Sequence, residues 1–333
     1  MNGIKKDDSF NVKYTGKTYD IQDFLKNHPG GSNYVDAFRD KDVTQKMLDN
    51  HHSKAAFYLL REYKLGGRDE IKNEHTEDLE DIVDWNKPMF GQVASLGEKY
   101  YEWVNSPVDR KMRLFGHPVL ETLTITPWYL VPIIWIPVAF VFIYLGTIKN
   151  AQTYTEIIKF SPICGLSVFF GIVLWTLAEY SLHRWVFHIV PSGKSKMMII
   201  VHFTIHGLHH KVPFDSRRLV FPPFPAGLIA AVLYYLYSSI LPQNLFEIIG
   251  GGTLLGYVGY DMIHFYIHHG NPNVGSYLYV MKRYHNQHHF SEHESGFGIS
   301  SQSWDVVFGT LIKLKKLAMG IRWTTNCTRN KIK

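Results

Sequence analysis

The sequence predicts a soluble front domain joined to an all-α membrane domain, and three observations support this fold class. Charge is distributed unevenly: residues 1–81 hold 13 Lys/Arg against 16 Asp/Glu, whereas residues 82–333 hold 22 against 13. Long uncharged runs occur only in the second part. Of the 18 histidines, 13 lie between His183 and His293, far more than an average composition gives. With 46% apolar and 19% charged residues, the composition also excludes a disordered chain.

Four apolar runs are candidates for membrane-spanning helices, which need roughly 20 residues each. Residues 122–148, 160–178 and 219–246 carry no charged side chain. The fourth run, 248–260, is short, but a helix that continues to Ile267 would complete a crossing. Its glycines include a Gly-x-x-x-Gly spacing, which lets helices approach closely. The sequence therefore predicts four transmembrane helices.

Charges in the loops predict the orientation in the membrane. The segment 184–218 holds six Lys/Arg against one acid, whereas the connection 147–159 holds two Lys. By the positive-inside rule, the segment 184–218 faces the cytosol. With four spans arranged as two hairpins, the front domain and everything after about residue 264 lie on the same side. Every dense group of histidines then shares one face of the membrane.

A histidine turn and a later histidine pair mark the front domain. His28 opens a His-Pro-Gly-Gly turn, whose proline and glycines can present an imidazole outward, as an axial metal ligand requires. His51 and His52 follow, directly before Ser53. A turn and a histidine pair at this distance favour a bound metal group over isolated surface histidines.

These motifs, together with Thr18-Tyr19-Asp20-Ile21 and Phe24-Leu25, make residues 4–67 resemble a cytochrome b5 domain. The resemblance implies an α+β fold that holds a b-type haem between His28 and His52. His52 is preferred over His51 because the family's second ligand directly precedes such a serine. Two axial imidazoles leave the iron no open position, so the expected role is electron transfer.

Ten of the later histidines form four groups with regular spacing. The groups are His183 and His188; His206, His209 and His210; His264 and His268; and His285, His288 and His289. Spacings of three and four residues put side chains on one face of a helix, so we expect each His-x-x-His-His triplet to direct three imidazoles toward one point. Ten imidazoles divided between two centres give about five for each metal ion. The sequence therefore predicts a dimetal site.

An all-nitrogen donor set suits zinc, iron, copper or nickel, and affinity does not choose among them. A haem electron donor on the same chain has no purpose beside redox-inert zinc, so we expect iron in the working protein. Zinc can still occupy the sites of isolated protein, because it forms stable histidine sites.

Four further residues are candidates for supporting roles. Glu179 and Asp261 each precede a ligand pair by one helical turn, and we expect them to accept hydrogen bonds from ligand imidazoles. His202 and His269 lie outside the repeated spacing and are candidates for roles beside the ligands or the substrate.

The histidine motifs and their neighbours resemble the membrane-integral fatty acid hydroxylase and sterol desaturase superfamily. The motifs that carry the resemblance are Glu179-Tyr180, His183-Arg184, Phe187-His188, His206-Gly207-x-His209-His210, His264-x-x-x-His268-His269, His285-x-x-His288-His289, Gly296-Phe297-Gly298 and Trp304-Asp305-x-x-Phe308-Gly309-Thr310. Behind a cytochrome b5 domain, the pattern resembles the fatty acid 2-hydroxylases, which make the 2-hydroxy acyl chains of sphingolipids. The resemblance implies haem b, two metal ions, dioxygen as co-substrate, a cytosolic helical cap over the dimetal site, and residence in the endoplasmic reticulum membrane.

The function implied by this resemblance is O2-dependent hydroxylation at the alpha carbon of a long-chain fatty acid or of the acyl chain of a ceramide. Electrons would come from cytochrome b5 reductase or cytochrome P450 reductase through the haem domain. A sterol desaturase or sterol methyl oxidase, using the same ligands on a ring, stays open as an alternative. A membrane metal transporter with a haem sensor would need histidines or acids within the spans, and the three long uncharged runs contain neither.

The expected domain boundaries are 1–69 for the haem domain, 70–118 for an acidic linker with an interfacial segment, and 119–333 for the membrane domain. Within the linker region, apolar residues at helical spacing over 90–104 predict a helix that lies on the bilayer surface or packs on the membrane domain. We expect no nucleic-acid partner. The sequence does not determine the acyl chain length of the substrate, the oligomeric state of the protein, or whether the substrate is a free fatty acid, an acyl-CoA or a ceramide.

Overall fold

A computed structural model describes residues 9–28, 32–50, 52–66 and 79–314. In the front domain, β1 (Asn11–Tyr14) and β2 (Lys17–Asp20) form an antiparallel hairpin in which Val12 faces Tyr19. The two turn residues, Thr15 and Gly16, both have positive φ, as the tight turn of a two-residue hairpin requires.

Short helices complete this α+β domain. They are η1 (Gln22–Asn27), α1 (Ser32–Asp36), α2 (Thr44–Asp49), α3 (Lys54–Leu60) and η2 (Arg61–Tyr63). Phe10, Val12 and Tyr19 form its buried core with Ile21 and Val43. The remainder of the His-Pro-Gly-Gly turn, residues 29–31, lies outside the described residues, as do His51 and the predicted boundary at 69–70.

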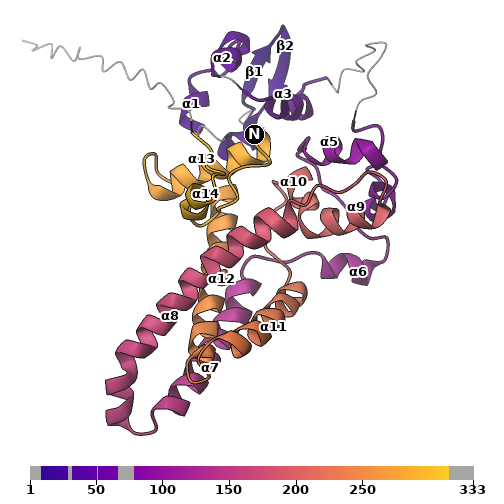
Figure 1. The fold of residues 1–333 in the computed structure, drawn as a ribbon. Helices are drawn as coiled ribbons and strands as arrows, with labels where there is room; N and C mark the ends of the chain where they lie inside the picture. Colours follow the sequence, from indigo (N-terminus) through magenta and orange to yellow (C-terminus); the bar gives the residue numbers. More distant parts are fainter. Residues whose placement is uncertain (1–8, 29–31, 51, 67–78, 315–333) are drawn as a thin grey trace, which may run out of the picture.

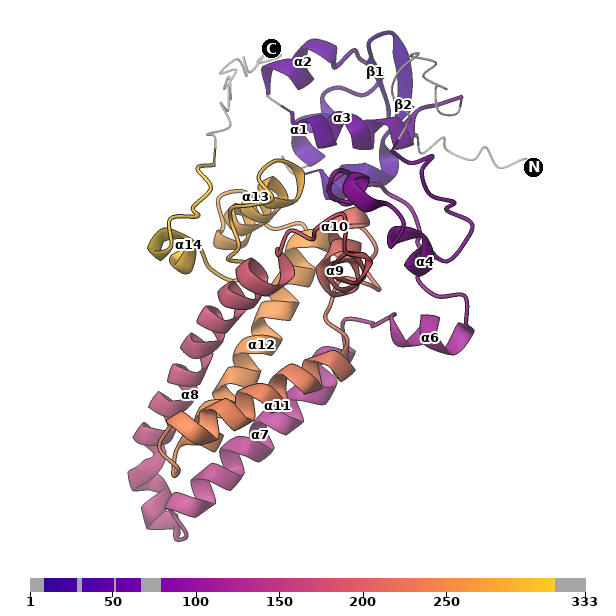
Figure 2. The same cartoon turned by 45° about the vertical axis from the view of Figure 1, so that its right-hand side comes forward.

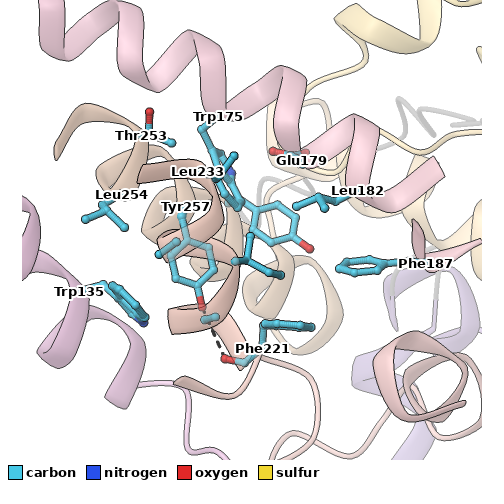
Figure 3. A pocket seen from close by; sticks show the side chains of 14 residues that line it. Trp135, Trp175, Glu179, Leu182, Phe187, Phe221, Leu233, Thr253, Leu254 and Tyr257 are labelled. Carbon is cyan, nitrogen blue, oxygen red and sulfur yellow. Dashed lines mark hydrogen bonds between the residues drawn. The ribbon is translucent and has the colours of Figure 1, made fainter. Parts of the chain in front are cut away.

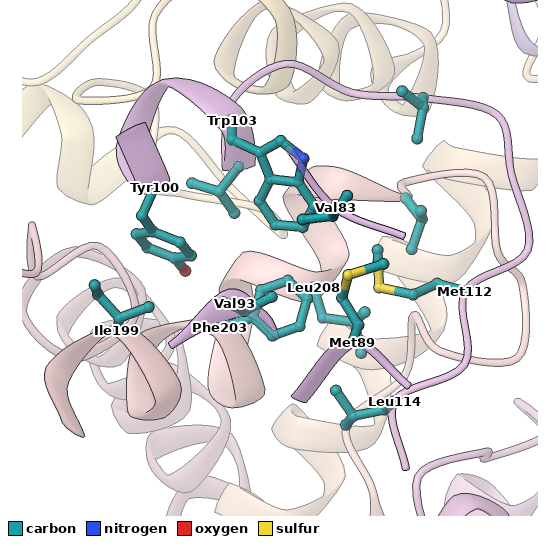
Figure 4. Close-up of a cluster of buried hydrophobic side chains, with 13 residues drawn as sticks. Val83, Met89, Val93, Tyr100, Trp103, Met112, Leu114, Ile199, Phe203 and Leu208 are labelled. Carbon is teal, nitrogen blue, oxygen red and sulfur yellow. The ribbon is translucent and has the colours of Figure 1, made fainter. Parts of the chain in front are cut away.

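The segment between the two domains packs on the membrane domain. It contains α4 (Met89–Val93), η3 (Gly97–Lys99), α5 (Tyr100–Val104) and α6 (Pro118–Leu123). The single helix expected over 90–104 is interrupted because Gly97 adopts φ +56°. Met89 and Trp103 are fully buried in one apolar cluster with Phe203 of the membrane domain (Figure 4). Of the two alternatives for this segment, packing on the membrane domain is therefore correct.

Four long helices run side by side in the membrane domain (Figures 1 and 2). They are α7 (Leu130–Asn150), α8 (Tyr154–Leu182), α11 (Pro223–Ile240) and α12 (Phe246–His269). Within the part of the chain that the structure describes, α7, α11 and the helical stretch Tyr154–Phe187 are long and apolar enough to cross a membrane. The fourth helix, α12, packs between α7 and α8 and falls outside that set. A fourth span stays a prediction.

The first span begins later than the sequence predicts, at Leu130 and not at residue 122. The residue before a proline is disfavoured in helical backbone, and Pro127 imposes this on Thr126. The N–H of Thr126 instead donates to the carbonyl of Arg217 at 2.8 Å. The preceding residues, 118–123, form the separate short helix α6.

Glycines hold α12 close to α7 and α8 but not to α11. A Cβ at Gly252 would lie 2.2 Å from the carbonyl oxygen of Val168 on α8, and a Cβ at Gly251 would lie 2.7 Å from that of Ala139 on α7. Both contacts need glycine. The one glycine of α11, Gly227, would bring a Cβ no closer than 4.0 Å to its nearest neighbour. Gly227 therefore does not draw α11 into a comparable close contact.

Short elements lie over one end of the bundle, between it and the front domain (Figure 2). They are the π-helical turns η4 (His183–Phe187) and η5 (Phe203–Gly207), and the helices α9 (Lys196–His202), α10 (Leu208–Lys211), α13 (Tyr277–Phe290) and α14 (Ser303–Val307). The loops that join α7 to α8 and α11 to α12 lie at the opposite end (Figure 1). All the predicted metal ligands therefore lie at the end that carries the front domain.

Candidate dimetal site

Ten imidazoles meet in two clusters at this end of the bundle. Cluster 1 consists of His183, His188, His206, His210 and His288, and cluster 2 of His209, His264, His268, His285 and His289. In each cluster, one ring nitrogen from every residue lies within 4.8 Å of the others. Every ring except that of His188 belongs to a buried residue.

Each His-x-x-His-His triplet contributes to both clusters. On α13, His285 and His289 belong to cluster 2, whereas His288 belongs to cluster 1; on η5 and α10, His209 is separated from its two partners in the same way. The expectation that each triplet points at one centre is therefore wrong. Residues four apart lie almost on one line along a helix, but neighbouring residues point about 100° apart, so the middle histidine faces the other cluster.

A π-helical turn explains why His183 and His188, five residues apart, belong to the same cluster. In an α-helix, residues five apart would point about 140° apart. In the wider turn η4, the N–H of His188 donates to the carbonyl of His183 at 3.0 Å, and the two rings lie 4.8 Å apart. Single π turns occur frequently at functional sites.

The spacing of the Nε2 atoms fits a shared cation better than hydrogen bonds among imidazoles. His206 Nε2 lies 3.0–3.1 Å from the Nε2 atoms of three other histidines in cluster 1. His285 Nε2 lies 2.9–3.0 Å from three in cluster 2. A neutral imidazole nitrogen has one hydrogen or one lone pair and cannot bond three such neighbours at once. Nitrogens that bind one ion at about 2.1 Å and at right angles lie about 3 Å apart.

The protonation states of the imidazoles also fit metal ligands. Burial and then the neighbouring imidazoles hold the pKa of His206 and of His285 well below the ordinary value of 6.5, so these rings are neutral. The buried Nε2 of His209 has no hydrogen-bond partner. His183 Nδ1 donates to the carbonyl of Phe297 at 2.6 Å, and His288 Nδ1 donates to that of Ser295 at 2.7 Å. These bonds leave the Nε2 lone pairs directed into cluster 1.

Glu179 and Asp261 contact loops and not the predicted ligands, contrary to the expectation from sequence. Glu179 Oε1 accepts hydrogen bonds from the backbone N–H of Ile299 at 2.9 Å and of Ser300 at 2.7 Å. Asp261 Oδ2 accepts a bond from the N–H of Phe221 at 3.3 Å. One turn before a ligand is the correct helical face for an orienting carboxylate, but a backbone carbonyl, that of Phe297, already occupies the Nδ1 side of His183, the ligand after Glu179. The two carboxylates anchor loops to α8 and α12.

His202 and His269 lie next to the clusters without belonging to them. The hydroxyl of Tyr100 donates to His202 Nδ1 at 2.6 Å, and burial lowers the pKa of His202 to about 4, so that nitrogen is free to accept. This bond fastens α5 to α9. The ring of His269 lies 5.0 Å from that of Phe265 and 6.3 Å from that of His268.

In the front domain, the rings of His28 and His52 face each other. Their centroids lie 6.2 Å apart, with 41° between the ring planes. His52 Nδ1 donates to the carbonyl of Met47 at 2.9 Å, which leaves the lone pair of its Nε2 available to bind a metal ion. An ion about 2 Å from one nitrogen of each ring requires ring centroids about 6 Å apart. The two residues fit an axial pair.

Polar contacts fix the front domain on the end of the bundle that carries the histidine clusters. Arg110 donates to both carboxylate oxygens of Glu62, at 2.7 and 3.0 Å. The hydroxyl of Tyr58 on α3 donates to Glu80 at 2.6 Å, and the same Glu80 oxygen pairs with Lys211 of α10 at 2.6 Å. Lys211 directly follows His210, so this pair connects α3 to the edge of cluster 1.

A row of aromatic rings crosses the same interface. The ring of Phe24 lies 6.0 Å from His28 and 5.8 Å from Phe214. Phe214 lies 6.2 Å from Phe290, which lies 6.3 Å from His289. Successive ring contacts therefore connect a predicted haem ligand to a predicted metal ligand.

The fold and the site define a two-part protein, in which a small α+β domain with opposed imidazoles joins a helical domain with membrane-spanning character and two histidine clusters. Residues 2–69 match the family model described as Cytochrome b5-like Heme/Steroid binding domain, and residues 168–310 match the one described as Fatty acid hydroxylase. A fatty acid 2-hydroxylase of Mus musculus is 40% identical over an alignment of 340 positions, which covers 90% of this chain and 91% of that protein. The chain belongs to the fatty acid hydroxylase family.

Other relatives agree. A dihydroceramide fatty acyl 2-hydroxylase of Arabidopsis thaliana is 41% identical over 238 residues, covering 71% of this chain and 96% of that protein. A solved structure described as "Full length scs7p (only hydroxylase domain visible)" matches with a TM-score of 0.60 at 32% identity, over 72% of this chain and 90% of that one. The cytochrome b5 domain implies a haem, and the histidine clusters of the hydroxylase domain suggest bound metal.

Proposed function

We propose that this protein hydroxylates the alpha carbon of long-chain fatty acids, or of the acyl chains of ceramides, with O2 and with electrons supplied through its own haem domain. The observation that carries the proposal is the pair of five-imidazole clusters directly beside a docked cytochrome b5 domain. When bound, the haem would supply single electrons and the two metal ions would activate dioxygen.

Each group of residues has a defined task in this proposal. The metal ligands are His183, His188, His206, His209, His210, His264, His268, His285, His288 and His289. His28 and His52 hold the haem. The carbonyls of Phe297 and Ser295 fix the orientation of two ligand rings. The haem electron donor on the same chain favours iron in the working enzyme, and the imidazole donors also permit zinc in isolated protein.

Aromatic side chains at the interface between the domains provide a path for the electron. Phe24, Phe214 and Phe290 form successive ring contacts between the haem ligand His28 and the metal ligand His289. The Arg110–Glu62 pair fixes the front domain to the segment that packs on the membrane domain. The haem itself would be reduced by a separate flavoprotein, cytochrome b5 reductase or cytochrome P450 reductase.

The membrane arrangement completes the proposal. Helix α12 serves as a fourth span, and α9, α10, α13 and α14 form a cytosolic cap over the dimetal site. The positive-inside rule supports this orientation, and the family resemblance supports the endoplasmic reticulum membrane. The domains cover residues 1–69, 70–118 and 119–333. A long acyl chain can then remain in apolar surroundings while its polar end reaches the metal ions.

Lipid profiling of cells that express the full chain tests the proposal. We expect 2-hydroxy fatty acids and 2-hydroxy ceramides to rise, and His209→Ala to abolish the rise with an unchanged haem spectrum. The matched control is His117→Ala, because His117 is exposed and lies outside both clusters. Full turnover by His209→Ala would contradict the site. Oxidised sterols in place of 2-hydroxy lipids would favour a sterol desaturase or sterol methyl oxidase.

A further inference from the structure

Two short motifs, residues 296–298 and residues 304–310, are hydrogen-bonded to each other beside cluster 1. Gly309 adopts φ +70°, a backbone conformation that favours glycine, where the chain turns back after α14. The N–H of Thr310 then donates to the carbonyl of Asp305 at 2.8 Å, and the carbonyl of Thr310 accepts the N–H of the first residue of the other motif at 2.9 Å. These bonds hold Asp305 against the loop that carries residues 296–298.

The carboxylate of Asp305 is fully buried and accepts hydrogen bonds from both motifs. Its Oδ1 accepts from the N–H of Phe297 at 2.9 Å and from the hydroxyl of Thr310 at 2.7 Å. Its Oδ2 accepts from the N–H of Gly298 at 2.8 Å. Burial raises the pKa of Asp305, but both oxygens act as acceptors, which is the pattern of an ionised carboxylate. A negative charge is therefore fixed at this loop.

The lack of a side chain at Gly298 permits the close approach. A Cβ at this position would lie 2.8 Å from Asp305 Oδ2 and 2.0 Å from the carbonyl oxygen of Ser301. Any other residue would therefore move the peptide away from the carboxylate. Contact with Asp305 and Ser301 explains why the second glycine of this motif is needed.

One peptide group connects Asp305 to a predicted metal ligand. The N–H of Gly298 and the carbonyl of Phe297 belong to the same peptide group. The N–H donates to Asp305, and the carbonyl accepts from His183 Nδ1 at 2.6 Å. Because successive hydrogen bonds polarise one another, the carboxylate makes this carbonyl a stronger acceptor. A stronger acceptor at Nδ1 raises the basicity of the Nε2 lone pair that faces cluster 1.

This connection to a charged group is particular to His183 among the ligands of the loop. His288 Nδ1 donates to the carbonyl of Ser295, but the N–H of that peptide group, which belongs to Gly296, donates to a neutral carbonyl. Three other ligands have a buried Nδ1 without a hydrogen-bond partner in the described part of the chain: His210, His285 and His289. The charge of Asp305 therefore reaches cluster 1 through His183.

We propose that Asp305 is a positioning residue for cluster 1, which orients His183 and raises its basicity as a metal ligand through the Phe297–Gly298 peptide. The inference rests on the metal ligands of the proposed function and deepens that function. A ligating imidazole commonly donates to a carboxylate or to a backbone carbonyl, and loss of such a partner costs about 10–100-fold in metal affinity. In this protein, the carbonyl and the carboxylate act in series.

Zinc titration of the metal-free full chain against a chromophoric chelator tests the proposal. Asp305→Asn removes the negative charge with little change in side-chain volume. We expect the variant to bind zinc about 10–100-fold more weakly, with an unchanged haem spectrum. Zinc affinity equal to that of the unaltered chain would overturn the proposal, and so would an unaltered chain that does not bind zinc.

Glu179→Gln is the matched control, because it removes a second buried carboxylate from the same loop. Glu179 projects from α8 among mostly apolar side chains (Figure 3). It accepts hydrogen bonds from the N–H groups of Ile299 and Ser300, which are not part of the peptide group that contacts His183. We expect this variant to keep its zinc affinity even if its Tm falls. Equal losses of affinity in both variants would show that the loop is merely anchored and would end the proposal.

Thr310→Val gives a second test that keeps the carboxylate. The change removes one donor from Asp305 Oδ1, so the remaining N–H donors, including that of Gly298, bond to a more basic carboxylate. We expect zinc affinity to stay unchanged or to rise, and a tenfold fall would contradict the proposed role.

The visible absorption of the cobalt(II)-loaded chain reports on the donor strength of the ligands and not on stability. We expect Asp305→Asn to shift the cobalt bands and Glu179→Gln to leave them in place. Identical spectra for the unaltered chain and Asp305→Asn would overturn the proposal. Zinc binding that depends on Asp305 in a chain that forms no 2-hydroxy lipid would instead contradict the proposed function and leave the role of Asp305 intact.

Discussion

Removal of Glu80 is expected to destabilise the protein strongly. Lys211 Nζ, whose side chain is 0% exposed, pairs with Glu80, whose side chain is 2% exposed, at 2.6 Å. It also donates to the carbonyls of Trp103 at 3.0 Å and Ser106 at 2.6 Å. Glu80→Ala keeps both carbonyls but removes the carboxylate of Glu80 from this buried ammonium. The change also removes the acceptor of the Tyr58 hydroxyl.

The magnitude follows from the burial of the pair. Removing one partner of a buried ion pair costs about 3–5 kcal/mol, because the other charge stays buried. For a domain of 150–250 residues, this is a fall in Tm of about 6–20 °C. An exposed pair in the same segment provides the control. Lys87 lies 3.1 Å from Asp84, but their side chains are 72% and 41% exposed, so Lys87→Ala should cost at most about 1 kcal/mol.

Thermal unfolding of the purified full chain, followed by tryptophan fluorescence, measures both changes. Replacing both partners, as in Glu80→Gln with Lys211→Met, should be milder than Glu80→Ala alone, because it leaves no buried charge. Similar Tm values for Glu80→Ala and Lys87→Ala would refute the reasoning. A double variant less stable than Glu80→Ala would refute it as well.

Four further changes test other parts of the structure. His288→Ala removes one Nε2 from cluster 1, so elemental analysis should find fewer than two metal ions per chain with an unchanged haem spectrum; two ions would contradict the ligand assignment. His52→Ala should abolish the haem absorption band while the metal content stays constant, and a normal band would exclude His52 as a ligand. Phe214→Ala breaks the row of rings at its centre, and stopped-flow absorbance should show about tenfold slower haem reoxidation, equivalent to roughly 1.4 kcal/mol; an unchanged rate would remove the row from the electron path. Gly252→Val forces a Cβ to within 2.2 Å of the carbonyl oxygen of Val168 unless α8 and α12 separate, so stability should fall by about 1–3 kcal/mol, and an unchanged unfolding midpoint would contradict the close packing.

Long, uncharged stretches predicted the helices of the bundle well, since apolar composition over about 20 residues depends little on tertiary contacts. The start of α7 was predicted eight residues too early because composition does not register the backbone restriction that Pro127 imposes on Thr126. Helix α12 is the one long helix of the bundle that does not meet the apolar composition of a membrane span. It is buried between α7 and α8, and glycines take the place of large apolar residues where it contacts them. Burial by other helices leaves its composition less apolar, so composition alone does not decide its place in the membrane.

The histidine positions could be predicted from spacing, but their division between the clusters could not. An α-helix spreads a His-x-x-His-His triplet over about 100°, and only the placement of a second helix decides which ring faces which centre. The π turn at His183 could not be predicted from the sequence either, since no residue type specifies it. The acceptors for His183 and His288 are backbone carbonyls of Phe297 and Ser295, which every residue possesses, so no side-chain signal identified them. The position of Glu179 one turn before His183 suggested a partner for that ligand, but its carboxylate anchors the loop at Ile299.

The interleaving of the triplets has a consequence for assembly of the centre. Helix α13 carries His285 and His289 of cluster 2 and His288 of cluster 1, so positioning the donors of one cluster also positions a donor of the other. Binding of a first ion would bear most of the entropic cost of ordering α10 and α13. A second ion would then bind to imidazoles that are already in position. We therefore expect cooperative loading of two metal ions, with little partly filled protein at any metal concentration.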